Sequence, residues 1–170
     1  MTYYNRKYKR FNVGNMEYLG SGEFGKVSHN KDIILKEYFS RVSPEWRISL
    51  DLFDILKTID NPHFIKLFDV YTELKFFDVL KAIVNSSKFY VDAYTAKYYA
   101  DNSVNVLWES KDYLLDNFRE LELLFEIFSK NKIRTCDVKL SNSIVGKDGI
   151  VIIDPDFFVI TDMGKELNSW

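Results

Sequence analysis

Residues 16–38 read MEYLGSGEFGKVSHNKDIILKEY, and the turns within them decide the fold that we expect. A glycine-rich turn separates two segments of strand-forming residues, and a tight turn at 30–32 separates the second segment from a third. Short segments divided by Gly, Asn and Asp are typical of consecutive antiparallel strands. This stretch therefore predicts a sheet built from hairpins.

Two longer segments predict helices. In residues 43–60, Ser43 suits the N-cap and Pro44 the first helical position, and apolar residues follow at helical spacing, at Leu52, Ile55, Leu56 and Ile59. Residues 110–131 form a longer amphipathic pattern, whose apolar side contains Leu114, Leu115, Phe118, Leu121, Leu124, Phe125 and Phe128.

Further strands are expected at 62–74, at 88–96 and from Gly149 onward. The chain therefore begins with a strand-rich half that holds one helix and continues, after a connector at 94–100, with a helix followed by short strands. We expect an α+β protein with two lobes, 1–96 and 97–170, and a ligand site between them.

Composition narrows the classes of function. The formal net charge of −2 makes nucleic acid an improbable partner, and the basic stretch Arg6–Arg10 is expected to be a solvated terminus. The single cysteine, Cys136, cannot form an internal disulfide, and no apolar run is long enough for a membrane span. We expect a cytoplasmic protein with no membrane partner, or a secreted effector that acts in a host cytosol.

The glycines of the turn, Gly20, Gly22 and Gly25, are the first candidates for a binding site. Glycine lets backbone N–H groups approach a bulky anion such as a polyphosphate, because no Cβ intervenes, although glycine is also common in plain hairpin turns. Lys36 follows on a neighbouring strand. Its ammonium would either reach the sheet edge or point at the same phosphates.

Residues 133–145 read IRTCDVKLSNSIV and place polar side chains between apolar runs. Asp137, Lys139 and Asn142 are followed by Asp154 at the end of a predicted strand. Carboxylate and amide oxygens suit Mg²⁺, which also takes phosphate oxygens and water. A magnesium-bound nucleotide would satisfy these groups.

Together these segments resemble the ordered motifs of protein kinases over residues 18–158. GSGEFGKV resembles G-x-G-x-x-G-x-V, IILK resembles V-A-I-K, TCDVKLSN resembles H-R-D-L-K-x-x-N, and IDPD resembles I-D-F-G. The resemblance implies a bilobal fold, with a five-stranded antiparallel N-lobe sheet plus one helix, and a reduced, mostly helical C-lobe.

The resemblance also implies the roles of single residues. Lys36 would hold the α- and β-phosphates, Asp137 would orient the attacking hydroxyl or accept its proton, and Lys139 would steady the transferred phosphoryl group. Asn142 and Asp154 would bind Mg²⁺. The residues implied to contact ATP are Gly20, Ser21, Gly22, Gly25, Val27, Lys36, Asp92 and Tyr94, the last two at the connector.

Several positions depart from the family pattern. Leu52 stands where the family has the glutamate that pairs with the strand-three lysine, and Asp51 and Asp54 lie on other faces of the helix. A slight rotation or register shift would bring Asp51 round, Glu45 is a more distant candidate, or the pair is absent. Thr135 and Cys136 replace His and Arg, and no A-P-E segment follows.

We therefore expect a minimal, truncated protein kinase of the bacterial or effector type, which uses ATP and Mg²⁺ to phosphorylate a protein hydroxyl, most simply Ser or Thr. Two alternatives remain. One is a pseudokinase that acts through a nucleotide or an activating protein partner, and the other is a small-molecule kinase of related fold.

Overall fold

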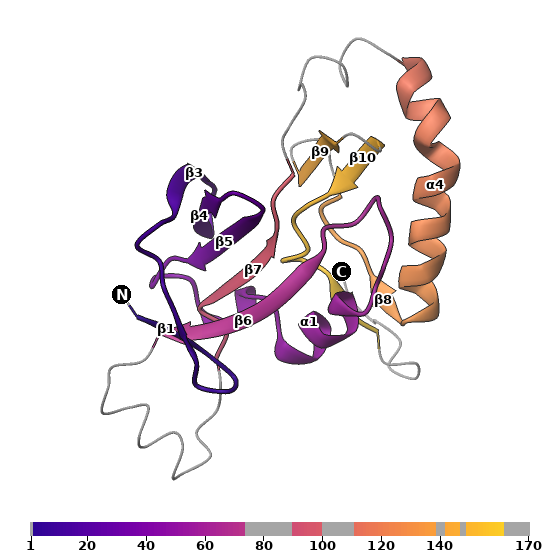
Figure 1. Cartoon of the computed structure of the whole chain (residues 1–170). Coiled ribbons are helices and arrows are strands. Elements are labelled where there is room, and N and C mark those ends of the chain that lie inside the picture. The colour runs from indigo at the N-terminus through magenta and orange to yellow at the C-terminus, as the bar shows by residue number, and fades with distance from the viewer. Residues whose placement is uncertain (1, 74–89, 100–110, 139–141, 147–148, 162–170) are drawn as a thin grey trace. The chain divides into compact units, whose positions relative to one another are not determined.

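The computed structural model describes residues 2–73, 90–99, 111–138, 142–146 and 149–161 (Figure 1). The chain divides into two compact units, one made of 1–57 and 66–98 and the other of 58–65 and 99–170. The boundary that we expect from the sequence is a single one after residue 96, whereas in the structure residues 58–65 also belong to the second unit. The assignment of the two halves as kinase lobes stays a prediction.

The first unit is built on an antiparallel sheet of seven strands, in the order β2-β1-β6-β7-β5-β4-β3. The expected number of five was too low, because the N-terminal residues add two strands. The hairpins predicted within residues 16–38 are confirmed. The strands are β1 Tyr3–Asn5, β2 Arg10–Phe11, β3 Glu17–Ser21, β4 Gly25–Asn30, β5 Ile33–Tyr38, β6 Leu67–Glu73 and β7 Ala93–Lys97.

The basic stretch at 6–10 covers the turn between β1 and β2 and the first residue of β2. Four of its five residues are exposed, so it is solvated as predicted, but it is part of the sheet rather than a free terminus. The side chain of Asn5 orders this turn, since its Oδ1 accepts hydrogen bonds from the N–H groups of Lys7 and Lys9, at 2.9 and 3.0 Å. Tyr3 is buried in a core cluster with Leu35, Tyr71 and Ala93. Burial of this aromatic ring stabilises the pairing of the N-terminal strand with the sheet.

The predicted helix at 43–60 is shorter than expected and is interrupted. Pro44–Trp46 form a 3₁₀ turn, η1, and the α-helix α1 covers only Leu50–Lys57. The break lies at Arg47, whose backbone is extended, with φ −101° and ψ 158°. Its guanidinium donates to Val42 O from Nε and Nη2, at 3.0 and 2.6 Å, and pairs with Asp92, so the Arg47 side chain is bound to residues outside the expected helix.

Opposite strand residues divide the sheet of the first unit into two faces. Lys36 pairs with Val27 on one side and with Tyr94 on the other, so these three side chains share a face. The helix α1 covers this face, since its buried Phe53 lies 6.3 Å from Tyr94 between ring centroids. The core cluster that contains Tyr3 occupies the other face.

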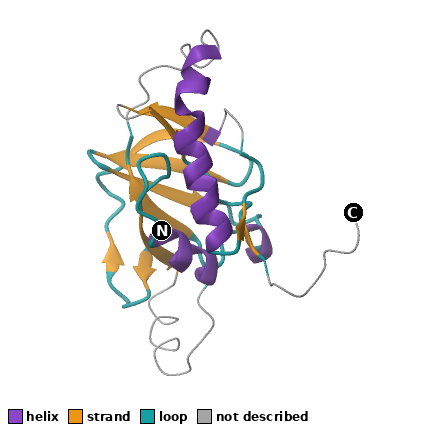
Figure 2. Cartoon of the chain, turned by 90° about the vertical axis from the view of Figure 1, so that its right-hand side faces the viewer, coloured by secondary structure: helices purple, strands orange, loops and turns teal. Residues whose placement is uncertain are grey.

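The second unit contains one long helix, α4 Lys111–Lys130, as the sequence predicts (Figure 2). Its described strands are short: β8 Ile133–Arg134 pairs with β11 Val159–Ile160, and β9 Ser143–Gly146 pairs with β10 Gly149–Ile152. Outside α4, the described part of this unit consists of strands and turns, so the expected mostly helical lobe is limited there to α4.

Aromatic packing joins the separate segments of the second unit. The ring centroids of Phe64 and Phe128 lie 5.2 Å apart, and those of Phe128 and Phe158 lie 5.4 Å apart, both with edge-to-face geometry. The segment 58–65 runs beside β10, since Ile65 N donates to Ile152 O at 2.9 Å. No described helix has the length and hydrophobicity that a membrane span requires.

Candidate functional site

The glycine turn connects β3 and β4 and closes with a hydrogen bond from Gly22 N to Gly25 O, at 2.9 Å. Its glycines are not equivalent. A Cβ on Gly25 would lie 2.3 Å from Glu37 O, so the packing of β4 against β5 requires glycine there. A Cβ on Gly20 or Gly22 would meet no described atom within 4 Å.

Neither Gly20 nor Gly22 is among the described residues with positive φ. Backbone conformation and packing within the described chain therefore give no reason for glycine at these two positions. A bulky ligand that approaches the backbone closely would give one. Ser21, between them, ends β3, and its Oγ accepts a hydrogen bond from the exposed Tyr18 hydroxyl at 3.1 Å.

Lys36 lies in the middle of β5 and is 8% exposed, so its side chain does not extend along the surface. Its Nζ lies 5.9 Å from the ring centroid of Tyr38 and 6.0 Å from that of Tyr94. The faces of these rings are electronegative and favour an ammonium group. Val27, across the β4–β5 pair, shares the face that holds Lys36.

The acids near α1 have environments that the sequence did not reveal. Leu52 is buried at 3% exposure, and Asp51 is exposed. Both oxygens of Asp54 accept hydrogen bonds from Arg6, at 2.6 and 2.8 Å, and this interaction lowers the pKa of the Asp54 carboxyl group. Glu45 lies on η1, where a hydrogen bond with Ser43 lowers its pKa.

The connector that was expected to begin at Tyr94 begins after β7, because Tyr94 is inside that strand and is 1% exposed. Asp92 precedes the strand, and its carboxylate forms an ion pair with Arg47. It also accepts hydrogen bonds from Thr72 Oγ1 at 3.0 Å and from Glu73 N at 2.7 Å. The Asp92 side chain thus has structural partners, and the nucleotide contacts proposed for Asp92 and Tyr94 stay predictions.

In the second unit, the side chain of Asn142 is hydrogen-bonded to Asp137. The Asn142 Nδ2 donates to Asp137 O at 2.8 Å and to Asp137 Oδ2 at 3.0 Å. Asp137 has φ 58°, a left-handed conformation that Asp adopts more readily than most residues. The amide therefore stabilises an uncommon backbone conformation and orients the carboxylate of the same residue.

The β9–β10 hairpin places Asn142 beside the segment that carries Asp154. Ser143 pairs with Ile152, and one step beyond them Ile153 N donates to Asn142 O at 3.0 Å. Asn142 and Asp154 therefore lie at the same end of the hairpin, just outside its last residue pair. Asp154 Oδ1 also accepts a hydrogen bond from Asp156 N at 3.4 Å.

This end of the hairpin carries the amide of Asn142 and the carboxylate of Asp154, and the Asn142 amide is hydrogen-bonded to the carboxylate of Asp137. Such oxygens suit Mg²⁺ when phosphate oxygens and water complete the coordination. Lys139 lies outside the described residues. Lys36 belongs to the first unit, and Asp137, Asn142 and Asp154 belong to the second.

A buried polar cluster on the opposite face of the sheet from Lys36 was not anticipated. Tyr3 OH donates to Glu37 Oε1 at 2.9 Å, and Lys26 Nζ lies 3.2 Å from Glu37 Oε2. Burial, followed by the hydrogen bond with Glu37, raises the pKa of Tyr3. The only signal in the sequence is a glutamate within a strand of apolar residues.

No family model matches the chain, and no curated protein matches it.

Proposed function

We propose that this chain is an ATP- and Mg²⁺-dependent phosphotransferase of the protein-kinase type, which phosphorylates a hydroxyl group of a protein. The main support is the geometry around Asn142, whose side chain orients Asp137 and whose backbone bonds to the strand that leads to Asp154. A candidate base and two candidate metal ligands are therefore linked within one unit.

The first unit contributes the second line of support. Gly20 and Gly22 face space that is free of described atoms, and Lys36 lies on the strand that follows the same hairpin. In the proposed complex, the glycine turn covers the phosphates of ATP and Lys36 pairs with the α- and β-phosphates.

The proposed reaction transfers the γ-phosphoryl group. The acceptor oxygen forms a bond to the γ-phosphorus, the bond from that phosphorus to the β–γ bridging oxygen breaks, and ADP leaves. Asp137 takes the proton of the acceptor hydroxyl. Mg²⁺, held by Asn142 and Asp154, would neutralise charge on the phosphate oxygens.

The direct test is a phosphotransfer assay with γ-labelled ATP and Mg²⁺, which measures autophosphorylation and ADP release. Asp137→Asn should lower the rate by about 10²-fold or more, since a positioned base typically contributes this much. Asp32→Asn, which changes an exposed acid in the 30–32 turn, should leave the rate unchanged. Equal rates for wild type and Asp137→Asn would reject the proposal.

A pseudokinase is the second candidate, and the surroundings of α1 favour it. Leu52 is buried where the family pattern has its glutamate, and Asp54 is bound by Arg6. If α1 supplies no acid to Lys36, as this pattern suggests, the chain would bind nucleotide and act through a protein partner. Saturable MgATP binding together with a rate unaffected by Asp137→Asn would support this candidate over the first.

A further inference from the structure

A hollow of about 600 Å³ lies beside the tip of the glycine turn, within the first unit. We name it the turn pocket, and its lining residues are Glu23, Phe24, Arg41, Val42, Ser43 and Trp46. Its volume is in the range of sites that bind small molecules or single side chains. Three segments contribute to it: the glycine turn, the residues after β5 and η1.

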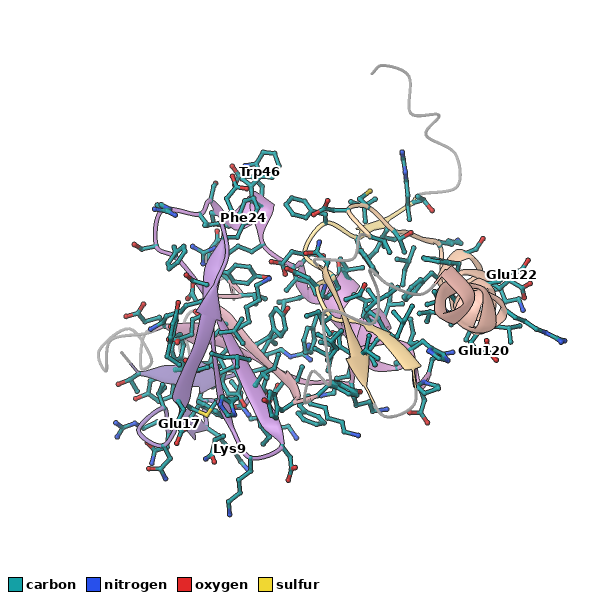
Figure 3. The ribbon with its side chains drawn as sticks, turned by 90° about the horizontal axis from the view of Figure 1, so that it is seen from above. Lys9, Glu17, Phe24, Trp46, Glu120 and Glu122 are labelled. Carbon is teal, nitrogen blue, oxygen red and sulfur yellow. The ribbon has the colours of Figure 1, made fainter. Side chains whose placement is uncertain are left out.

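Two aromatic rings give the turn pocket an apolar lining. Trp46 is 56% exposed, and Phe24 lies close to it (Figure 3). Val42, which also lines the pocket, is buried at 7% exposure. An exposed tryptophan next to a hollow is typical of protein-binding sites, because tryptophan is enriched among the residues that contribute most to the free energy of binding between proteins.

Arg41 adds a positive charge to this apolar lining. Its guanidinium carbon lies 4.9 Å from the ring centroid of Phe39, and its Nη2 donates to Glu23 O at 3.4 Å. In this unit Arg6 pairs with Asp54 and Arg47 pairs with Asp92. For Arg41, no carboxylate of the described residues lies within ion-pair distance, so its charge is available to an incoming anion.

We propose that the turn pocket docks an acidic peptide segment of a protein partner. An aromatic or long aliphatic side chain of that segment enters between Trp46 and Phe24, and a neighbouring Asp or Glu pairs with Arg41. The rim also carries the carboxylate of Glu23, which is exposed. This charge disfavours a second acid on its side of the pocket and so orients the peptide.

A peptide bound in the turn pocket would contact the glycine turn directly. Phe24 lines the pocket and also accepts a hydrogen bond at its backbone O from Phe39 N, at 2.9 Å. The partner would therefore contact the tip of the turn and the segment that leads to α1 at the same time. Peptide docking does not depend on the proposed phosphotransferase activity. Peptide binding is measured without nucleotide, so the two proposals are tested separately.

The test uses two synthetic peptides that share a central Phe, one with flanking Glu residues and one with flanking Lys residues. Binding is read from the fluorescence of Trp46 in the full chain carrying Trp108→Phe and Trp170→Phe. We expect saturable binding of the Glu peptide that is about tenfold or more tighter than binding of the Lys peptide. Arg41→Glu should reverse this preference.

A second set of variants is measured by calorimetry with the Glu peptide. Trp46→Ala should abolish binding, whereas Tyr18→Ala, which removes an exposed aromatic ring outside the pocket, should leave it unchanged. Unchanged melting temperatures would show that the variants are folded. The proposal is overturned if neither peptide binds saturably, or if Arg41→Glu and Trp46→Ala bind both peptides as the wild type does.

Discussion

Packing within the sheet requires glycine at position 25, but not at positions 20 and 22. The backbone of Glu37 approaches Gly25 so closely that a methyl group would overlap it, whereas the space beside the other two glycines is open among the described atoms. Packing thus demands glycine at Gly25, whereas the demand that we propose for Gly20 and Gly22 is ligand binding.

Alanine substitutions should separate these two demands. Gly25→Ala should destabilise the fold by about 1–3 kcal/mol or more, because a backbone atom cannot move aside easily. Gly20→Ala and Gly22→Ala should change stability by only about 0.5 kcal/mol, as surface substitutions do, but weaken ATP binding. Urea denaturation and nucleotide titration measure the two effects, and unchanged ATP affinity in the last two variants would contradict the proposed role of the turn.

The Arg6–Asp54 pair should make a small contribution that depends on pH. Both side chains are more than a third exposed, so screening by water limits the pair to about 0.2–1 kcal/mol. The pKa of Asp54 is lower in the folded state than in the unfolded state, so the contribution is fully present above the unfolded value of about 4 and is lost as the pH falls through the lower, folded-state value.

Comparison of wild type with Asp54→Asn in urea measures this contribution. The difference in unfolding free energy should be present at pH 7, shrink in 1 M salt, as surface ion pairs do, and decrease progressively as the pH is lowered below the unfolded-state pKa. A difference that does not change with pH would show that Asp54 acts through packing rather than through its charge.

At the scale of elements, β1 is attached to the sheet by more than its backbone. Its Tyr3 ring lies in the core cluster, and its hydroxyl bonds to Glu37 of β5. The Asn5 Nδ2 also donates to Asp69 Oδ2 of β6, at 2.9 Å. The N-terminal hairpin is therefore an integral part of the first unit.

Tyr3→Phe should test this attachment at neutral and alkaline pH. At pH 7 the loss of the hydroxyl leaves a buried Glu37 oxygen without its donor, which costs about 1–3 kcal/mol. Because the pKa of Tyr3 is raised on folding, the folded state keeps its proton above pH 10 while the unfolded state loses it. Wild-type stability should therefore fall above pH 10, by up to about 1.4 kcal/mol per pH unit for this group.

Urea midpoints at pH 8 and pH 11 measure the alkaline effect. The fall should be smaller in Tyr3→Phe, and some fall should remain, because burial also raises the pKa of Tyr71. Tyr18→Phe, with an exposed ring, should behave as the wild type. An equal fall in wild type and Tyr3→Phe would exclude Tyr3 as its source.

At the scale of the whole molecule, the proposed function assigns nucleotide-binding roles to residues of both units. MgATP should then raise the melting temperature, since a ligand at a hundred times its Kd stabilises the folded state by about 2.7 kcal/mol. Asp154→Asn should remove the part of this shift that depends on Mg²⁺, and Lys36→Met should reduce the shift with or without the metal. Thermal denaturation with ATP, with and without Mg²⁺, measures these effects.

The matched control is Asp32→Asn, whose shift should equal that of the wild type. If MgATP leaves the melting temperature of the wild type unchanged at millimolar concentration, both the phosphotransferase and a nucleotide-binding pseudokinase are rejected. The docking proposal for the turn pocket would remain open to its own test.

Local patterns predicted the elements whose formation is local. The hairpins of residues 16–38 and the helix α4 were anticipated, because turn residues and apolar periodicity are properties of adjacent positions. The helix expected over residues 43–60 was only partly correct. Its regular pattern could not reveal that Arg47 would bond to Val42 and pair with Asp92.

The sequence by itself determined the hairpin order, the position of α4 and the residue types available for the candidate site. Only the tertiary structure decided that Gly25 packs against Glu37, that Asp54 pairs with Arg6, and that the Asn142 amide holds Asp137. The physical reason is distance: periodicity acts between neighbours in the chain, whereas the partner of a charge or a polar group is chosen through space, after the backbone has folded.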